Sequence, residues 1–200
     1  MGEKQVFQPL TKEDKITVVL YRVGIVLSTI MMSLLAYFVA ALFPSGISRI
    51  GASTDILAYI LYVSVGMSVF FIHLYIGRFK TYLKNLYFIS LGCLVALLYI
   101  GKGSLTNALA QEPYSALLLL PLSGCLGFVT AKEAFCFKLI EGYLLAMIMP
   151  VYLLLVSSSQ LSGRGASYGL VLIAAMLVIF TLRKVFMPIA YDIGDKAAYQ

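Results

Sequence analysis

The sequence predicts an all-α membrane protein, a bundle of six transmembrane helices with both termini on the cytoplasmic side. Three observations favour this fold class: the apolar composition, six long uncharged runs, and an uneven distribution of basic residues between them. Hydrophobic residues make up 61% of the 200 residues and charged residues 12%, whereas soluble domains have about 45–50% and about 25%. A soluble protein this apolar would expose large sticky patches, so lipid is the solvent that suits the chain.

Six uncharged runs are long enough to cross a bilayer, which takes about 20 apolar residues. Their apolar stretches are continuous, which is not the alternation of barrel strands, and helices are the other structure that satisfies its backbone in lipid. The predicted helices cover about 23–43, 56–76, 85–101, 114–130, 142–158 and 168–186. They form a transmembrane domain at 23–187, between an N-terminal cytoplasmic tail at 1–22 and a C-terminal cytoplasmic tail at 188–200.

Local signals mark the ends of several elements. In the N-terminal tail, Thr11 and Asp14 have the spacing of a weak capping box, which predicts an interfacial helix ahead of the first span. Pro44 is expected to end the first helix, because proline cannot continue one. Pro121 and Pro150 fall inside the fourth and fifth runs and are expected to kink those helices.

The loop charges predict the orientation of the six helices. One side collects 12 of the 15 Lys and Arg residues, and the other holds only Arg49, Lys102 and Arg164. The positive-inside rule places the richer side, with both termini, in the cytoplasm or the plastid stroma. The basic residues flank apolar runs and form no dense patch, so the net charge of +6 does not predict nucleic-acid binding.

No stretch of the sequence predicts catalytic or metal-ligating residues, so we do not expect an enzyme. The three cysteines form no CxxC pair. The nearest approach to the Gly-x-Ser-Gly motif of a rhomboid-like protease is Pro121-Leu122-Ser123-Gly124. The last helix has no histidine to activate that serine.

His73 is the single histidine and lies near the cytoplasmic end of the second predicted helix. It has two interpretations. It is a polar residue satisfied near the lipid headgroups, about one turn from Arg78, or it is an axial ligand of a chlorophyll. A chlorophyll or carotenoid contact is the one cofactor expectation that we draw from the sequence.

The segment from 131 to 142 combines charged and aromatic residues. Glu133, Phe137 and Glu141 recur every four residues and would share one face of a helix, and Lys138 can pair with Glu141. We expect an interfacial helix on the cytoplasmic face. It is either a solvated connector or a partner-docking surface formed by Glu133, Phe137, Lys138 and Glu141.

Pairs of small residues four apart predict close contacts between helices. They are Gly24 with Ser28, Ser64 with Ser68, and Gly142 with Ala146. Without a large side chain at either position, two helix backbones can approach one another.

Two stretches carry a family resemblance. The first is Thr11-Lys12-Glu13-Asp14 followed by Tyr21-Arg22-Val23-Gly24, and the second is Lys132-Glu133-Ala134-Phe135-Cys136-Phe137 followed by Glu141. Together with six helices in 200 residues, they resemble the DUF2301 integral membrane proteins of cyanobacteria and plastids. The resemblance implies a thylakoid or plastid membrane and a role around the assembly of the photosystem II reaction centre. It brings no established activity or catalytic residues.

Two functions therefore stay open. The first is a non-catalytic assembly or scaffold factor that contacts membrane lipids and photosystem II subunits or other assembly factors. The second is a small-solute transporter or channel. It would need a polar cavity near the two proline kinks, lined by Ser123, Ser90 or Ser68.

Overall fold

A computed structural model describes residues 10–42, 51–74 and 76–193, and these residues form helices and no strand. In chain order the elements are α1 (Lys12–Leu42), α2 (Gly51–Phe71), α3 (Gly77–Ile100), α4 (Leu105–Gln111), the 3-10 helix η3 (Pro113–Leu119), α5 (Leu120–Phe137), α6 (Ile140–Ser157), α7 (Gly163–Val185) and α8 (Ala190–Ile193). Within the described part of the chain, six helical segments are long and apolar enough to cross a membrane, which confirms the predicted number. They are α1, α2, α3, η3 with α5, α6 and α7.

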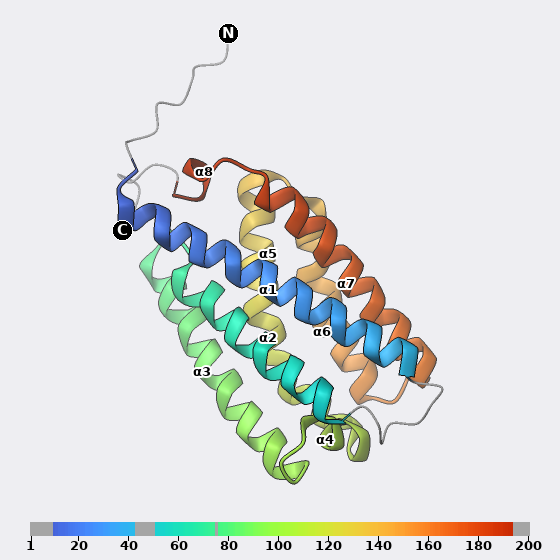
Figure 1. The fold of residues 1–200 in the computed structure, drawn as a ribbon. Coiled ribbons are helices and arrows are strands. Elements are labelled where there is room, and N and C mark those ends of the chain that lie inside the picture. Colours follow the sequence, from blue (N-terminus) through green and yellow to red (C-terminus); the bar gives the residue numbers. More distant parts are fainter. Residues whose placement is uncertain (1–9, 43–50, 75, 194–200) are drawn as a thin grey trace.

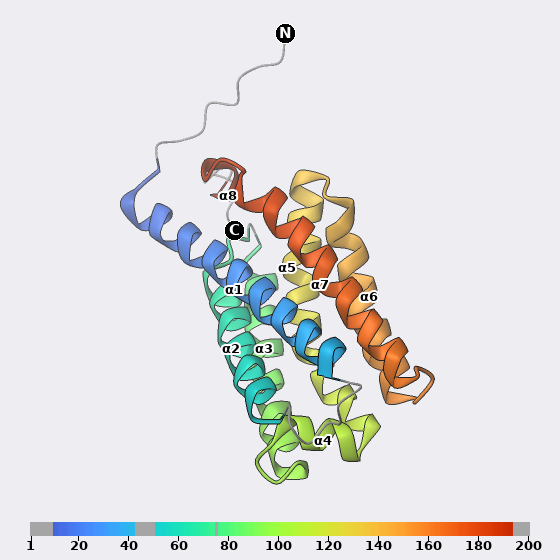
Figure 2. The ribbon, with the colours of Figure 1, turned by 45° about the vertical axis from the view of Figure 1, so that its right-hand side comes forward.

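The long helices run alternately up and down, so the bundle has two distinct ends (Figures 1 and 2). The charged end holds the start of α1, the ends of α5 and α7, and α8. The cavity end holds the end of α1, α4, η3, and the turn from α6 to α7. Helix α1 packs against both α2 and α7, and thereby joins the early and late parts of the chain.

The first helix is longer than predicted. The capping box is present, since the backbone N–H of Asp14 donates to Thr11 Oγ1 (3.2 Å) and that of Thr11 donates to Asp14 Oδ2 (2.8 Å). Helix α1 then runs without a break from Lys12 to Leu42, so the predicted interfacial helix and the first span are one helix. The predicted end at Pro44 lies outside the described residues.

The fourth span differs from the prediction at its proline. Pro121 does not kink a continuous helix. It lies in the first turn of α5, directly after η3, where a missing N–H leaves no hydrogen bond unmade. Pro150 does lie inside α6, as predicted. The short helix α4 was not predicted, and Ser104 caps it by accepting from the backbone N–H of Asn107 (3.2 Å).

The small residues lie where helices approach closely, as predicted. A Cβ added to Gly24 would lie 2.8 Å from the backbone O of Ser64 and 2.5 Å from Ser68 Oγ. Ser28 Oγ and Ser64 Oγ are hydrogen-bonded at 2.9 Å across the same α1–α2 contact. At the α5–α6 contact, a Cβ on Gly142 would lie 2.5 Å from the backbone O of Thr130.

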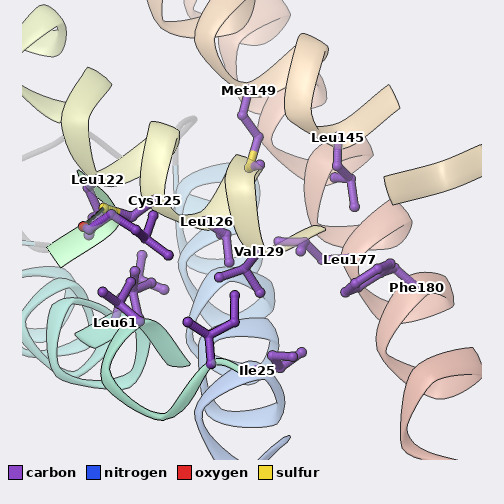
Figure 3. Close-up of a cluster of buried hydrophobic side chains, with 14 of the residues drawn as sticks. Ile25, Leu61, Leu122, Cys125, Leu126, Val129, Leu145, Met149, Leu177 and Phe180 are labelled. Carbon is purple, nitrogen blue, oxygen red and sulfur yellow. Dashed lines mark hydrogen bonds between the residues drawn. The ribbon is translucent and has the colours of Figure 1, made fainter. Parts of the chain in front are cut away.

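The main apolar core lies in the middle of the bundle and toward the charged end. Val129, Leu145 and Phe180 are fully buried there, from α5, α6 and α7 (Figure 3). Tyr21 and Ile25 of α1 belong to the same cluster. Because these helices contact one another through this core, their charged ends are held close together.

Candidate functional site

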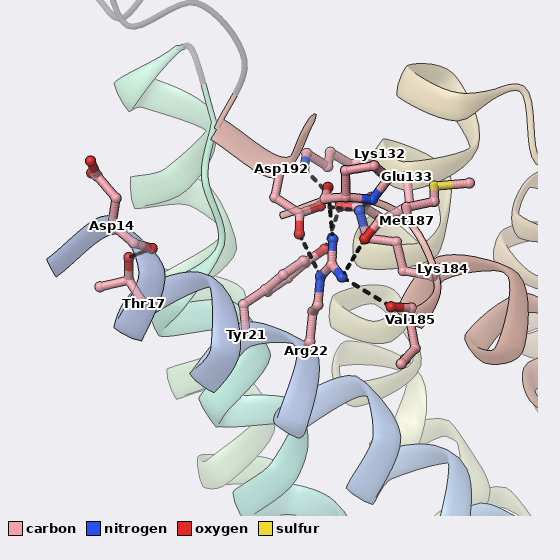
Figure 4. A network of polar contacts seen from close by, with 11 residues as sticks. Asp14, Thr17, Tyr21, Arg22, Lys132, Glu133, Lys184, Val185, Met187 and Asp192 are labelled. Atoms are coloured by element: carbon pink, nitrogen blue, oxygen red, sulfur yellow. Dashed lines mark hydrogen bonds and ion pairs between the residues drawn. The ribbon is translucent and has the colours of Figure 1, made fainter. Parts of the chain in front are cut away.

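A cluster of buried charges occupies the charged end of the bundle, with Glu133 at its centre (Figure 4). The Glu133 side chain is fully buried near the end of α5. Its Oε1 accepts a hydrogen bond from the hydroxyl of Tyr21 (2.7 Å) and pairs with Lys132 Nζ (2.7 Å). Its Oε2 pairs with Nζ of Lys184, which is also fully buried. A carboxylate in apolar surroundings is stable only with such partners.

A second carboxylate, Asp192 of α8, extends the cluster. It pairs with Lys184 through Oδ1 and with Arg22 Nε through Oδ2 (2.6 Å). The Arg22 guanidinium also donates to backbone carbonyls just beyond or at the end of α7. These acceptors are Val185 (3.0 Å), Met187 (2.7 Å) and Pro188 (3.2 Å). Carbonyls at a helix end lack partners within the helix, so Arg22 satisfies them from α1.

Aromatic rings cover the cations of this cluster. Lys184 Nζ lies 4.1 Å from the ring centroid of Phe137, and Lys132 Nζ lies 5.6 Å from that of Tyr21. The ring of Phe137 also contacts that of Tyr191 in an edge-to-face arrangement (6.4 Å). Cation–π contacts of this kind are strongest when the cation is shielded from water. The rings therefore shield the charges of the cluster from solvent, and the contacts of the cluster join α1, α5, α7 and α8.

The structure separates the four predicted docking residues. Glu133 is buried in the cluster and does not face outward, which corrects that prediction. Phe137 is half-buried against Lys184, and Glu141 accepts from Arg183 at 2.7 and 2.9 Å. Only Lys138 is exposed.

The reason is a turn that the sequence pattern did not reveal. Helix α5 ends at Phe137 and α6 begins at Ile140, so residues 133, 137 and 141 do not share one helical face. Lys138 adopts a left-handed conformation (φ 55°) at the end of α5. The following N–H, of Leu139, returns to the carbonyl of Ala134 (3.2 Å). The predicted interfacial helix is thus the last part of α5 and a tight turn.

His73 lies in the connection after α2, because that helix ends at Phe71 and not near 76 as predicted. Its Nε2 is 3.2 Å from Thr17 Oγ1. Nδ1 is buried and has no hydrogen-bond partner among the described residues. Burial lowers the pKa of His73, and the nearby charges of Lys132 and Lys80 lower it further.

A cavity of about 410 Å³ opens at the cavity end of the bundle. It extends from Val156 and Gly163, near the turn between α6 and α7, to Met149 and Ile173 in the middle of these helices. Its lining is predominantly apolar, with side chains from α1, α2, α4, η3, α5, α6 and α7. Beyond Met149 the buried core shown in Figure 3 follows.

One of the three serines proposed for a cavity lines it. Ser123 does so, and its Oγ is buried without a hydrogen-bond partner among the described residues. Ser68 instead donates to the carbonyl of Ser64 (3.3 Å) at the α1–α2 contact, and Ser90 donates to that of Tyr87 (2.6 Å). Their hydroxyls satisfy the backbone of their own helices.

Sequence reasoning missed several residues of both regions. Lys184 and Arg22 look like ordinary basic flanks of spans, and Asp192 looks like part of a solvated tail. Tyr62 lines the cavity with a hydroxyl that has no partner among the described residues, but in the sequence it looks like one of many aromatic residues. The sequence did contain one signal for the cluster. Glu133 lies next to an apolar run, and a Glu in that position requires a partner when it is buried. The sequence does not say which of the many nearby cations provides it.

The fold and these two regions define the class of the protein. It is an integral, multi-pass α-helical membrane protein with six membrane-length helices in its described residues. The chain belongs to DUF2301, a family described as uncharacterised integral membrane proteins, whose model matches residues 67–200. This confirms the resemblance. The match includes Lys132, Glu133, Lys184 and Asp192 of the cluster, and it begins after Tyr21 and Arg22 of α1. No curated protein and no solved structure matches the chain.

Proposed function

We propose that the protein is a non-catalytic scaffold or assembly factor of a photosynthetic membrane, and that it docks a partner through the turn between α5 and α6. One observation supports the choice of this turn as the docking surface. Phe135 and Ile140 are 80% and 70% exposed beside the exposed Lys138, directly next to the buried Glu133 cluster. We call these three residues the docking turn.

The cluster supports this role by fixing the position of the turn. Glu133 lies two residues before Phe135 in α5, and it is tied to α1 through Tyr21 and to α7 through Lys184. The close backbone contact at Gly142 fixes the start of α6. A surface that is ordered before binding loses less conformational entropy when a partner arrives.

The chemistry of the docking turn indicates the partner. Two exposed apolar side chains flank a lysine, so the complementary surface is apolar with an acidic group. A membrane protein with such a surface at the bilayer boundary fits best. The resemblance to proteins of cyanobacteria and plastids directs the choice of partner to photosystem II subunits and their assembly factors, in the thylakoid membrane. His73 as a pigment ligand belongs to the same proposal.

Affinity purification of the full chain from native membranes tests the proposal, with mass spectrometry and pigment spectra of the recovered material. The double variant Phe135→Ala/Lys138→Glu is expected to reduce partner recovery at least tenfold. A matched control is Phe88→Ala/Lys102→Glu, which changes an exposed phenylalanine and an exposed lysine of α3 and the turn that follows it. Recovery without photosystem subunits would exclude the assembly role, and equal recovery by both variants would exclude the docking turn.

The cavity favours a second candidate, a small-solute transporter. A solute that enters at the cavity end would find space as far as the middle of the bundle. The predominantly apolar lining favours a neutral, apolar solute over an ion. Uptake of such a solute into vesicles containing the purified protein tests this candidate, and uptake no faster than in empty vesicles would exclude it.

A further inference from the structure

The cavity has the size and lining of a site for a small lipid-soluble molecule. Its volume of about 410 Å³ lies within the roughly 300–1,000 Å³ typical of small-molecule sites. At its inner end Val129, Leu145 and Phe180 are fully buried and close the bundle toward the charged end. The buried core therefore closes the inner end of the cavity, and a molecule in the cavity would stop near Met149.

Two hydroxyl groups in this pocket have no partner among the described residues. Tyr62 is 2% exposed, lines the pocket and has an unpaired hydroxyl. Ser123, on α5, also lines the pocket, and its Oγ is unpaired. A buried hydroxyl without a hydrogen bond is unfavourable. A ligand with a hydrogen-bond-accepting oxygen would satisfy either group.

Two other hydroxyls of the same lining provide the contrast. Tyr152 donates to the carbonyl of Ala166 (3.0 Å), and Ser167 donates to the carbonyl of Gly163 (3.0 Å). Both are occupied by the backbone of α7. The unpaired state of Tyr62 and Ser123 is therefore a property of those two positions and not of every hydroxyl in the pocket.

The charges of the described lining disfavour an anionic ligand. The described residues that line the pocket include one carboxylate, Asp55, and no Lys, Arg or His. Asp55 Oδ1 accepts from the backbone N–H and the hydroxyl of Thr106, at 2.8 and 2.7 Å. A fatty-acid or phosphate headgroup would meet this carboxylate and no cation in the lining, whereas a neutral molecule would meet no opposing charge.

We propose that this pocket binds a neutral, lipid-soluble carbonyl compound whose carbonyl oxygen accepts hydrogen bonds from Tyr62 and Ser123 while its apolar part fills the remaining space. Two sources share this chemistry, a quinone with an apolar tail and a neutral acyl ester of glycerol. The proposal goes beyond the docking turn and does not depend on it, because the pocket lies at the opposite end of the bundle.

Binding to the purified full chain in a neutral detergent tests the assignment. The two probes are a decyl-substituted benzoquinone and a monoacylglycerol, each labelled with ¹³C at the carbonyl. Saturable binding is followed by infrared spectroscopy, where hydrogen bonding lowers the carbonyl stretching frequency. For the quinone, quenching of fluorescence gives a second measurement, since the chain has 14 tyrosines and no tryptophan. Saturation by the quinone alone identifies a quinone site, and saturation by the ester alone identifies an acyl site.

The variants separate the two hydroxyls from the rest of the lining. Tyr62→Phe and Ser123→Ala each remove an unpaired hydroxyl and are expected to raise Kd about five- to tenfold, the value of one hydrogen bond. The matched controls Tyr152→Phe and Ser167→Ala are expected to change Kd less than twofold. Ala58→Phe places a ring in the pocket and is expected to abolish saturable binding.

Three results would overturn the proposal. The first is no saturable binding of either probe by the wild-type chain. The second is an equal effect of Tyr62→Phe and Tyr152→Phe, since the unpaired hydroxyl would then have no special role. The third is saturable binding by a folded Ala58→Phe variant with unchanged Kd, which would place the probe outside the pocket.

Discussion

The two ends of the bundle differ in whether their buried polar groups have hydrogen-bond or ion-pair partners. At the charged end, Glu133 has a partner for each carboxylate oxygen, and Asp192 likewise contacts two cations. At the cavity end, the buried hydroxyls of Tyr62 and Ser123 have none among the described residues, and both residues line the pocket. Because a polar group in lipid has no water to bond with, satisfied groups hold helices together and unsatisfied groups are available to a ligand. We therefore expect the charged end to stabilise the fold and the cavity end to bind a ligand.

The largest expected effect comes from removing one charge at the charged end. Lys184→Met deletes the cation between Glu133 and Asp192 and leaves two buried carboxylates short of a partner. We expect a loss of about 3–5 kcal/mol in the free energy of unfolding, the usual result of breaking a buried ion pair. Unfolding by sodium dodecyl sulfate in mixed micelles measures it. The control Lys138→Met changes an exposed lysine and should cost less than about 0.5 kcal/mol. Equal losses would contradict the cluster's structural role.

At the cavity end, two tyrosines are expected to respond in different directions in the absence of ligand. Tyr152→Phe removes the hydrogen bond to the carbonyl of Ala166 and should destabilise the protein by about 1 kcal/mol. Tyr62→Phe removes a hydroxyl that has no bond to lose, so stability should stay the same or rise. The same unfolding measurement compares the two. A loss of similar size in both variants would show that Tyr62 is satisfied in the membrane.

A smaller effect is expected for the ion pair outside the cluster. The Arg183 side chain is 53% exposed, and its Nη1 donates to both carboxylate oxygens of Glu141. Arg183→Ala should reduce the free energy of unfolding by less than about 1 kcal/mol, because exposed pairs gain little over hydration. Raising the salt concentration should reduce the difference between variant and wild type. A loss as large as that of Lys184→Met would mean that Arg183 belongs to the cluster.

The smallest effect is a pH dependence from His73 at the charged end. Since the folded protein lowers its pKa below the ordinary value of 6.5, the unfolded chain binds more protons than the folded one just below that pH. Stability should therefore fall as the pH drops from about 7 through this window. The melting temperature measured between pH 7.5 and 5 tests this, with His73→Gln as the variant that lacks the dependence. His73 is the only histidine, so no other imidazole contributes. An identical slope in the variant would assign the dependence to carboxylates.

Much of the fold could be predicted from the sequence, and the failures have local reasons. The number of spans was predicted correctly because each contains an uncharged run of membrane length, although several helices begin or end at other residues than predicted. Pro121 was misplaced because a hydropathy pattern does not distinguish the first turn of a helix from its interior. The capping box at Thr11 and Asp14 was predicted, but the sequence did not show that the interfacial helix and the first span form one helix, because polar Thr17 and Arg22 lie between them.

The candidate sites were harder to predict than the fold. The segment around Glu133 was correctly singled out, but its carboxylate was expected to face a partner. The turn at Lys138 separates Glu141 from the helical face of Glu133. Glu133 itself contacts Tyr21 and Lys184, which are far away in the sequence. No periodicity records such a contact, because the positions of α1 and α7 relative to α5 follow from the packing of the whole bundle.

The sequence by itself determined the membrane as solvent, the number of long helices, the close contacts at Gly24 and Gly142, and an expected orientation from the basic loops. These follow from composition, run length and spacing, which are properties of neighbouring residues. Only the tertiary structure decided which cations neutralise Glu133 and Asp192, and which hydroxyls near Ser123 stay unpaired. Both depend on distant side chains being brought together, as Tyr21 and Lys184 are with Glu133, since a buried charge or hydroxyl is satisfied by whatever the fold places within hydrogen-bond distance.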